Sequence, residues 1–224
     1  VKMGKESKKR SIVQPHLILC EGADEWNFLI RLLNHWIPED AAFNTIQVID
    51  FGGNDELKNF LETLPLLPNY EIVRSILIIR DAEQDYHAAI QSIKSSLKNN
   101  CFPVPDTVHQ IIQGDRLKIA YSLFPTCSDA PQNGTLEDLA YSLLRNTDYP
   151  TAHLTEVNEF LEKIESLNNK KFARRHKNKL HTCFSINDDY VTLKIGEAAL
   201  AGAFDFSSTL LSPLKKLIFN LVSE

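Results

Sequence analysis

Two short apolar runs in the first half of the chain end in acidic residues. The run LILC ends at Glu21, and the run SILII ends at Asp81 and Glu83. Such runs are typical of buried parallel strands, and open α/β sheets carry their chemistry at the carboxyl ends of these strands. Neighbouring strands lie about 5 Å apart, so we expect Glu21 and Asp81 to face one another across a small gap.

These acids have the chemistry of a divalent metal site. Carboxylates that lie close together without a cation repel one another and raise each other's pKa. Mg2+ is bound by oxygen ligands, commonly one or two carboxylates with waters and substrate phosphates. A bound Mg2+ or Mn2+ supports phosphodiester chemistry by neutralising charge and activating water. We therefore expect Glu21, Asp81 and Glu83 to hold a metal with Glu137, which opens a later helix.

Each neighbouring acid also has a structural explanation. Acids in the first turn of a helix complement its dipole, which accounts for Glu25 and Glu137. Asp85 is placed to cap a helix, and Asp138 forms a capping-box pattern with Thr135. We keep Asp85 and Asp138 as candidates for a metal ligand or for a residue that supports one.

The main alternative to a metal site is a structural ion pair, because Arg80 could pair with one of these acids. Side chains alternate along a strand, so Arg80 is expected to point away from Asp81. Two independent strands that end in acids, in this order, favour the metal site over a structural pair.

Strand and helix patterns alternate up to residue 146 and are helical afterwards. This alternation predicts an α/β fold with a mostly parallel sheet flanked by helices. We expect a mobile basic tail over residues 1–14, an α/β domain over 15–146, and a helical extension over 147–224 that packs on the core. The expected strands are 17–20, 45–51, 75–79, and 108–112 with 119–124 as a hairpin; the expected helices are 24–36, 56–64, 85–97, 135–144, 154–167, 170–181, 195–203 and 212–222.

We expect an ordinary soluble globular protein from the composition. The chain has 224 residues, a formal net charge of -5 and a pI near 5.8, which argues against a generally basic nucleic-acid coat protein. Its four cysteines have no CxxC spacing, so we expect a reducing cytoplasm and no zinc. No apolar run approaches 18 residues, so we expect no membrane partner.

One basic segment stands out in this acidic chain. The sequence KKFARRHKNK places six cations within ten residues, enough to neutralise several phosphates. A solvated helix face is the simpler explanation, but with a metal site elsewhere a nucleic-acid path is the better one. The expected nucleic-acid-binding residues are Lys170, Lys171, Arg174, Arg175, Lys177 and Lys179.

The two acidic motifs resemble the Toprim domain. Its signature is an apolar strand ending in Glu-Gly and a later apolar strand ending in Asp-x-Asp; here they are LILCEGADE and ILIIRDAEQD. GTLEDL and IGEAALAGAFDFSSTLLSPLKKL resemble small uncharacterised prokaryotic Toprim-like proteins, similar to the OLD-family nucleases. The resemblance covers about residues 15–221. It departs at Glu83, where the common form has Asp.

The resemblance implies a Rossmann-like Toprim core with a Mg2+-binding acidic cluster. It implies that Glu21 is a general acid/base or a metal ligand, and that Asp81 and Glu83 are metal ligands. Glu25 and Glu137 are then candidates for a second ion or for proton transfer. No tyrosine domain, zinc ribbon or P-loop accompanies the motifs, so we do not expect a topoisomerase, a primase or a full-length OLD protein.

The leading hypothesis is a Mg2+- or Mn2+-dependent phosphodiester-processing enzyme, a nuclease acting on DNA or RNA. The alternative is a non-catalytic Toprim-like module that binds nucleic acid or a protein partner. Transfer on a small phosphorylated substrate is a third option. A receiver domain would use Asp81 as a phosphoacceptor, but the strand ending SLFPT has no lysine at its end, which disfavours that class.

Overall fold

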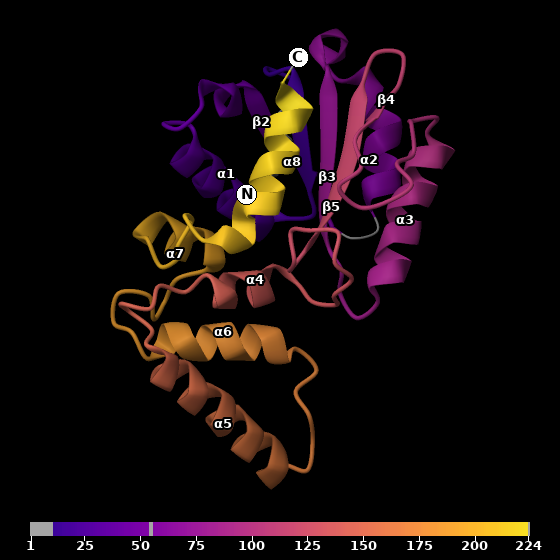
Figure 1. Cartoon of the computed structure of the whole chain (residues 1–224). Coiled ribbons are helices and arrows are strands. Elements are labelled where there is room, and N and C mark those ends of the chain that lie inside the picture. The colour runs from indigo at the N-terminus through magenta and orange to yellow at the C-terminus, as the bar shows by residue number, and fades with distance from the viewer. Residues whose placement is uncertain (1–10, 54–55, 224) are drawn as a thin grey trace, which may run out of the picture.

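A five-stranded sheet organises the protein. The structure is a computed structural model that describes residues 11–53 and 56–223 (Figure 1). The strand order is β2-β1-β3-β5-β4, with all pairs parallel except β4–β5. This arrangement confirms the expected α/β class with a Rossmann-like core. The strands are β1 (His16–Cys20), β2 (Ile46–Asp50), β3 (Ser75–Asp81), β4 (Ile112–Gln113) and β5 (Lys118–Phe124).

Helices cover both faces of the sheet, which is why its strands are apolar on both sides. Leu17 and Leu19 of β1 pack in one apolar cluster with α2 and α3, while Ile18 and Cys20 pack in the other with α1 and α8. Figure 1 shows the two helix pairs on opposite sides of the strands. These helices are α1 (Ala23–Trp36), α2 (Leu57–Thr63), α3 (Tyr86–Asn99) and α8 (Ser212–Val222).

The remaining helices lie beyond the carboxyl ends of the central strands. Helix α4 packs against α6, and α6 packs against α5, which lies farthest from the sheet (Figure 1). One apolar cluster runs from the sheet face into all of these helices. Their bounds are α4 (Leu136–Ser142), α5 (Thr151–Leu167), α6 (Arg175–Ser185) and α7 (Ile195–Ala201). The division of the chain into two domains stays a prediction.

Helix α7 lies unusually close to α1. A Cβ atom built on Gly196 would lie only 2.2 Å from the Cβ of Asn27, so a side chain at this position cannot be accommodated without a shift. The glycine thus permits the close approach of the two helices. In the described residues no helix is long and apolar enough to cross a bilayer. Short 3-10 helices lie at Ala41–Thr45, Leu64–Leu66, Tyr70–Ile72 and Thr209–Leu211.

Two predicted elements are wrong in extent. The expected strand 108–112 is reduced to β4, because His109 adopts a left-handed φ of 64° and Val108 packs into the core instead. The expected helix 170–181 begins only at Arg175 and continues to Ser185. Residues 168–174 form a loop instead.

The predicted basic tail falls mostly outside the described residues, which begin at Ser11. Within the described part, residues 11–14, one residue packs into the core. Ile12 is fully buried, and its backbone N–H donates to the Pro68 carbonyl at 3.1 Å. The folded chain therefore begins before residue 15, the start that we expected.

Candidate functional site

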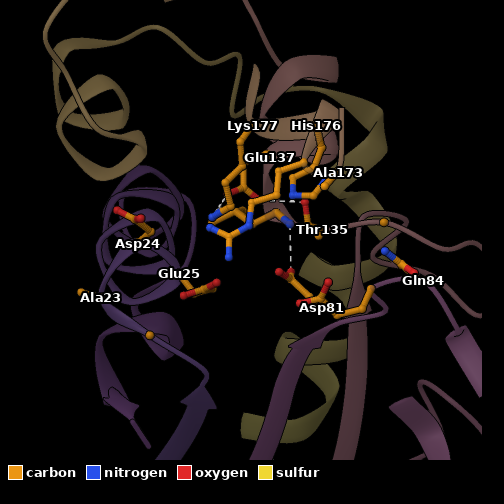
Figure 2. Close-up of a pocket in the computed structure, with 15 residues that line it drawn as sticks. Ala23, Asp24, Glu25, Asp81, Gln84, Thr135, Glu137, Ala173, His176 and Lys177 are labelled. Atoms are coloured by element: carbon orange, nitrogen blue, oxygen red, sulfur yellow. Dashed lines mark hydrogen bonds and ion pairs between the residues drawn. The ribbon is translucent and has the colours of Figure 1, made fainter. Parts of the chain in front are cut away.

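A polar pocket lies where β1 and β3 end. Its volume is about 560 Å³, and it lies between the first turns of α1 and α4 and the start of α6. Figure 2 shows Glu25 and Asp81 facing one another across it, with Glu137 and Lys177 above them. Its charged lining residues are Asp24, Glu25, Asp81, Glu83, Glu137, Arg174 and Lys177.

Asp81 is the last residue of β3 and is 8% exposed. Its Oδ1 accepts a hydrogen bond from the Leu136 backbone N–H at 2.8 Å, which ties β3 to the start of α4. Burial raises the pKa of Asp81 well above its ordinary value, and the charges of Glu25, Glu21 and Glu137 raise it further. This carboxyl group therefore favours a proton or a bound cation over an isolated negative charge.

Glu25 lies in the first turn of α1, where the helix dipole favours an acid. Its side chain nevertheless reaches into the pocket toward Asp81 (Figure 2). Burial, followed by repulsion from Glu21 and Asp24, raises the pKa of Glu25 to about 7. A glutamate that only complements the helix dipole would not have a raised pKa. The helix dipole by itself therefore does not explain Glu25.

Glu21 is turned away from the pocket and is not among its lining residues. Its Oε2 lies 3.8 Å from Arg80 Nε and accepts a hydrogen bond from the Asp81 backbone N–H at 3.4 Å. Arg80 also donates to Ser92 of α3 at 3.0 Å, so it points away from Asp81 as predicted. Arg80 therefore forms the structural ion pair that we considered as the alternative, and its partner is Glu21 rather than Asp81. Burial outweighs Arg80 and raises the pKa of Glu21.

Glu83 is held by its backbone. It adopts a left-handed φ of 54°, and its N–H and carbonyl exchange hydrogen bonds with Gly134, both at 2.8 Å. Gly134 has a φ of 137°, a conformation that glycine tolerates, and a Cβ there would collide with Asp138. This bridge joins the end of β3 to the residue before the α4 cap, which the sequence motif did not indicate.

Glu137 forms the clearest polar contacts in the pocket. It is 6% exposed, accepts a hydrogen bond from Thr135 Oγ1 at 2.7 Å, and lies 2.7 Å from Lys177 Nζ. Burial opposes its ionisation, but the hydrogen bonds from Lys177 and Thr135 hold the pKa of Glu137 below its ordinary value. Glu137 is therefore a buried carboxylate that is already neutralised by a protein cation.

The structural explanation is confirmed for the two remaining acids. Asp85 caps α3 by accepting the Ala88 backbone N–H at 2.9 Å. Asp138 completes the capping box of α4 by accepting the Thr135 backbone N–H at 2.9 Å. Neither of these aspartates lines the pocket.

The expected metal ligands do not form a ready cluster. Within residues 11–53 and 56–223, no three His, Cys, Asp or Glu side chains are grouped closely enough to hold a metal ion. Two of the expected ligands are engaged by protein cations instead, since Lys177 pairs with Glu137 and Arg80 pairs with Glu21. A metal ion entering the pocket would compete with these cations.

The basic segment does not form one cationic face. Arg174 and Lys177 line the pocket, while Lys170 is exposed. The spacing of the segment gave no indication that Lys177 would pair with Glu137. Such a pair could be found only from the fold, since the two residues belong to different helices that lie far apart in the chain.

Three other cations of this segment contact partners outside the pocket. Lys171 and Arg175 pair with Glu165, a buried acid that we did not single out. The ammonium group of Lys179 lies 3.6 Å from the centre of the Tyr141 ring, a cation–π contact. Three of the six predicted nucleic-acid-binding residues are thus engaged within the helical region.

Fold and pocket together define an α/β protein with an acidic pocket and a cationic wall at the carboxyl edge of its sheet. The chain belongs to the family described as "Protein of unknown function (DUF3226)", which matches residues 15–223. The match spans the sheet and the C-terminal helices together. No curated protein and no solved structure matches the chain.

Proposed function

We propose that this protein is a Mg2+- or Mn2+-dependent phosphodiester-processing enzyme, a Toprim-like nuclease that acts on DNA or RNA. One observation carries the proposal. The pocket brings together the carboxylates of Glu25, Asp81 and Glu137 and the cations of Arg174 and Lys177. Phosphodiester cleavage needs carboxylates to hold a metal and cations to neutralise the phosphate.

The donor chemistry suits a hard divalent cation, because the acidic side of the pocket offers carboxylate oxygens, although in the described residues these are not grouped closely enough to form a site without a shift. Asp81, Glu83 and Glu137 would hold the ion, and Glu21 would join them only by leaving Arg80. When bound, the metal would neutralise phosphate charge and activate water. Burial, then the charges of neighbouring carboxylates, raises the pKa of Asp81, and a bound cation would offset both effects.

The chain's own residues supply the other roles. Glu25, with a pKa of about 7, can accept or deliver a proton near neutral pH. Lys177 and Arg174 would contact phosphate oxygens, with Lys177 exchanging Glu137 for the ligand. These roles suit a phosphodiester substrate. We also propose a cytoplasmic location, which the four free cysteines support.

A second function is favoured by the Lys177–Glu137 ion pair. This pair already supplies a cation to the pocket, and the expected ligands are not grouped for a metal among the residues that the structure describes. A non-catalytic module that binds nucleic acid or a protein partner through Arg174 and Lys177 would have this arrangement.

Cleavage and metal binding test the two functions. We expect the protein to cleave single- or double-stranded DNA or RNA with Mg2+ or Mn2+. Asp81→Asn should reduce the rate at least about 10- to 100-fold, the loss seen even for residues that only orient metal ligands. Asp85→Asn is the matched control at the same end of β3, because asparagine also caps helices and activity should persist.

Calorimetric titration with Mn2+ distinguishes the alternatives. Binding that Asp81→Asn abolishes supports the enzyme. If the wild-type protein binds no Mn2+ and cleaves no nucleic acid, the enzymatic proposal is wrong and the binding module is the better one.

A further inference from the structure

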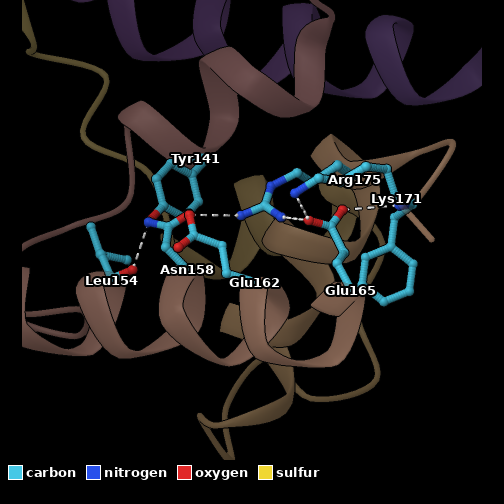
Figure 3. Close-up of polar contacts among 8 residues, drawn as sticks. Tyr141, Leu154, Asn158, Glu162, Glu165, Lys171 and Arg175 are labelled. Carbon is cyan, nitrogen blue, oxygen red and sulfur yellow. Dashed lines mark hydrogen bonds and ion pairs between the residues drawn. The ribbon is translucent and has the colours of Figure 1, made fainter. Parts of the chain in front are cut away.

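A buried glutamate outside the pocket holds the loop that carries the cationic wall. Glu165 lies near the end of α5 and is 2% exposed. Its Oε1 accepts the Phe172 backbone N–H at 2.9 Å, and its Oε2 accepts from Lys171 Nζ at 3.0 Å and from Arg175 Nη1. Figure 3 shows Arg175 and Lys171 converging on this carboxylate.

All three donors come from one short segment. Glutamates are almost never fully buried unless they are paired, so this environment is specific. The Phe172 backbone N–H and Lys171, with Arg175 beside them, hold the pKa of Glu165 below its ordinary value. The Lys170 backbone N–H also donates to the Glu165 carbonyl, at 3.1 Å. Glu165 therefore holds the chain where it leaves α5.

The same segment continues into the pocket. We name residues 168–177 the strap: the loop after α5 and the first residues of α6. Glu165 anchors it on the side away from the pocket, and Glu137 anchors it inside through Lys177. Arg174 lies between the two anchors and lines the pocket. The position of both pocket cations thus depends on how the strap is held.

We propose that Glu165 is a positioning residue that holds the strap so that Arg174 and Lys177 can reach a phosphate-bearing ligand. The inference rests on the proposed function for the ligand class, a nucleic-acid strand. It goes beyond that function because Glu165 contacts neither the pocket nor the ligand. It also explains why an acid stands next to a basic, polyanion-binding segment.

Simple electrostatics predicts the opposite effect, which makes the proposal testable. Removing a negative charge from a basic segment should strengthen binding of a polyanion. If Glu165 positions the strap, its removal should weaken binding, because Arg174 and Lys177 lose their fixed geometry. The sign of the change therefore separates positioning from charge.

The test compares two matched variants on α5. Glu162 is 65% exposed on its side chain and pairs with Arg175 of the strap at 3.5 Å. Glu165→Ala and Glu162→Ala each remove one negative charge and favour the helix equally. The probe is a labelled single-stranded oligonucleotide in the presence of EDTA, so that binding is measured without cleavage.

We expect Glu165→Ala to bind the oligonucleotide several-fold more weakly, and Glu162→Ala to bind as the wild type or more tightly. Glu165→Gln keeps an acceptor for the Phe172 N–H and should recover part of the binding. The salt dependence of binding should also fall for Glu165→Ala, by about 0.7 in slope for each phosphate of a single strand that the variant no longer neutralises. Equal or tighter binding by Glu165→Ala would overturn the positioning role.

Hydrogen exchange tests the strap independently of any ligand. In the wild-type protein the Phe172 amide should exchange slowly although it lies outside a helix, since Glu165 accepts its hydrogen bond. Protection over the strap should be lost in Glu165→Ala and kept in Glu162→Ala. Fast exchange at Phe172 in the wild-type protein contradicts the inference, even where a variant does not fold. A wild-type protein that neither cleaves nucleic acid nor binds it refutes the proposed function, while exchange still decides the strap.

Discussion

The two ends of the sheet carry opposite charge. The carboxyl end holds the acidic pocket, whereas the amino end has a pocket of about 500 Å³ lined by His16, Arg74, Arg116 and Lys118, with no acidic side chain in its described lining. The amino end therefore gathers cations, whereas the carboxyl end gathers carboxylates together with Arg174 and Lys177. The two ends differ in how those charges are satisfied.

Backbone carbonyls satisfy the cations of the amino end. Lys118 Nζ donates to the carbonyl of Ser223, just after α8, and Arg74 donates to the carbonyls of Glu71 and Val73 at 3.0 and 3.2 Å. Cations placed near a helix C-terminus are stabilising. At the carboxyl end, by contrast, burial and then repulsion between neighbouring carboxylates raise the pKa of Glu25 and of Asp81. Uncompensated charge, rather than the number of charges, thus identifies the candidate site.

The largest expected effect is at the ion pair that compensates one of the acids. Lys177→Met should leave Glu137 buried without its cation and lower the free energy of unfolding by about 2 kcal/mol, less than for a fully buried pair because the pocket is open to water. Denaturant unfolding measures this change. The double variant Glu137→Gln/Lys177→Met is the control and should recover stability. An unchanged Lys177→Met protein would mean that water already compensates Glu137.

The pH dependence of stability should differ between the two ends of the sheet. At the carboxyl end, Glu25 should make the protein less stable as the pH rises. In the unfolded chain Glu25 loses its proton near pH 4.5, but in the folded protein it keeps the proton until about pH 7. Stability is therefore lost as pH rises through this window. Glu25→Gln should become more stable than the metal-free wild type by roughly 1–2 kcal/mol between pH 4.5 and 7, after allowance for solvent screening. Thermal unfolding at several pH values checks this, and parallel curves for the two proteins would contradict it.

Nucleic-acid binding should distinguish the exposed arginines of the two ends. Arg174→Ala should weaken oligonucleotide binding by about fivefold, as expected when one or two phosphates are no longer neutralised, while Arg116→Ala should change it less than twofold. Fluorescence anisotropy at fixed salt gives both values. If Arg116→Ala has the larger effect, the amino end is the nucleic-acid surface and the roles of the two ends are reversed.

The smallest effect concerns His16 at the amino end, and its sign is opposite to that of Glu25. Burial, then the charges of Lys118 and Arg74, lowers the pKa of His16. Below pH 6.5 the unfolded chain takes up a proton that the folded protein resists, so stability falls as pH falls. His16→Gln should reduce this acid-side destabilisation by less than about 1 kcal/mol. Unfolding between pH 5 and 7 tests it, and a decrease of the same size in the variant would argue against this role.

Residue patterns predicted the strands that are buried on both faces and the edge at which acids meet. Apolar runs such as SILII admit few other structures, and parallel pairing brings their ends together. Asp81 lies where this logic places it, and Glu25 reaches the same pocket from the first turn of α1. The orientation of Glu21 was not predictable, because its carboxylate could reach either the pocket or Arg80, and only packing decides between them.

Long-range partners also explain the two wrong elements. Lysine and arginine favour helices, so 170–174 was predicted to be helical. Glu165 binds the Phe172 backbone N–H and side chains of this segment, and these contacts favour the loop. Near residue 108 the apolar pattern matches a strand, but burial of Val108 and the left-handed His109 override it. Local propensity is a weak guide where a distant group offers better hydrogen bonds.

The close approach of α7 to α1 has a consequence for the family as a whole. A Cβ at position 196 would occupy the space of Asn27, so a side chain at position 196 requires a smaller residue at position 27 or a shift of the helices. These two positions, far apart in the chain, are expected to covary among related sequences. Asn27 lies two residues from Glu25, so a relative that changes both positions would also reveal whether the pocket tolerates a rotated α1.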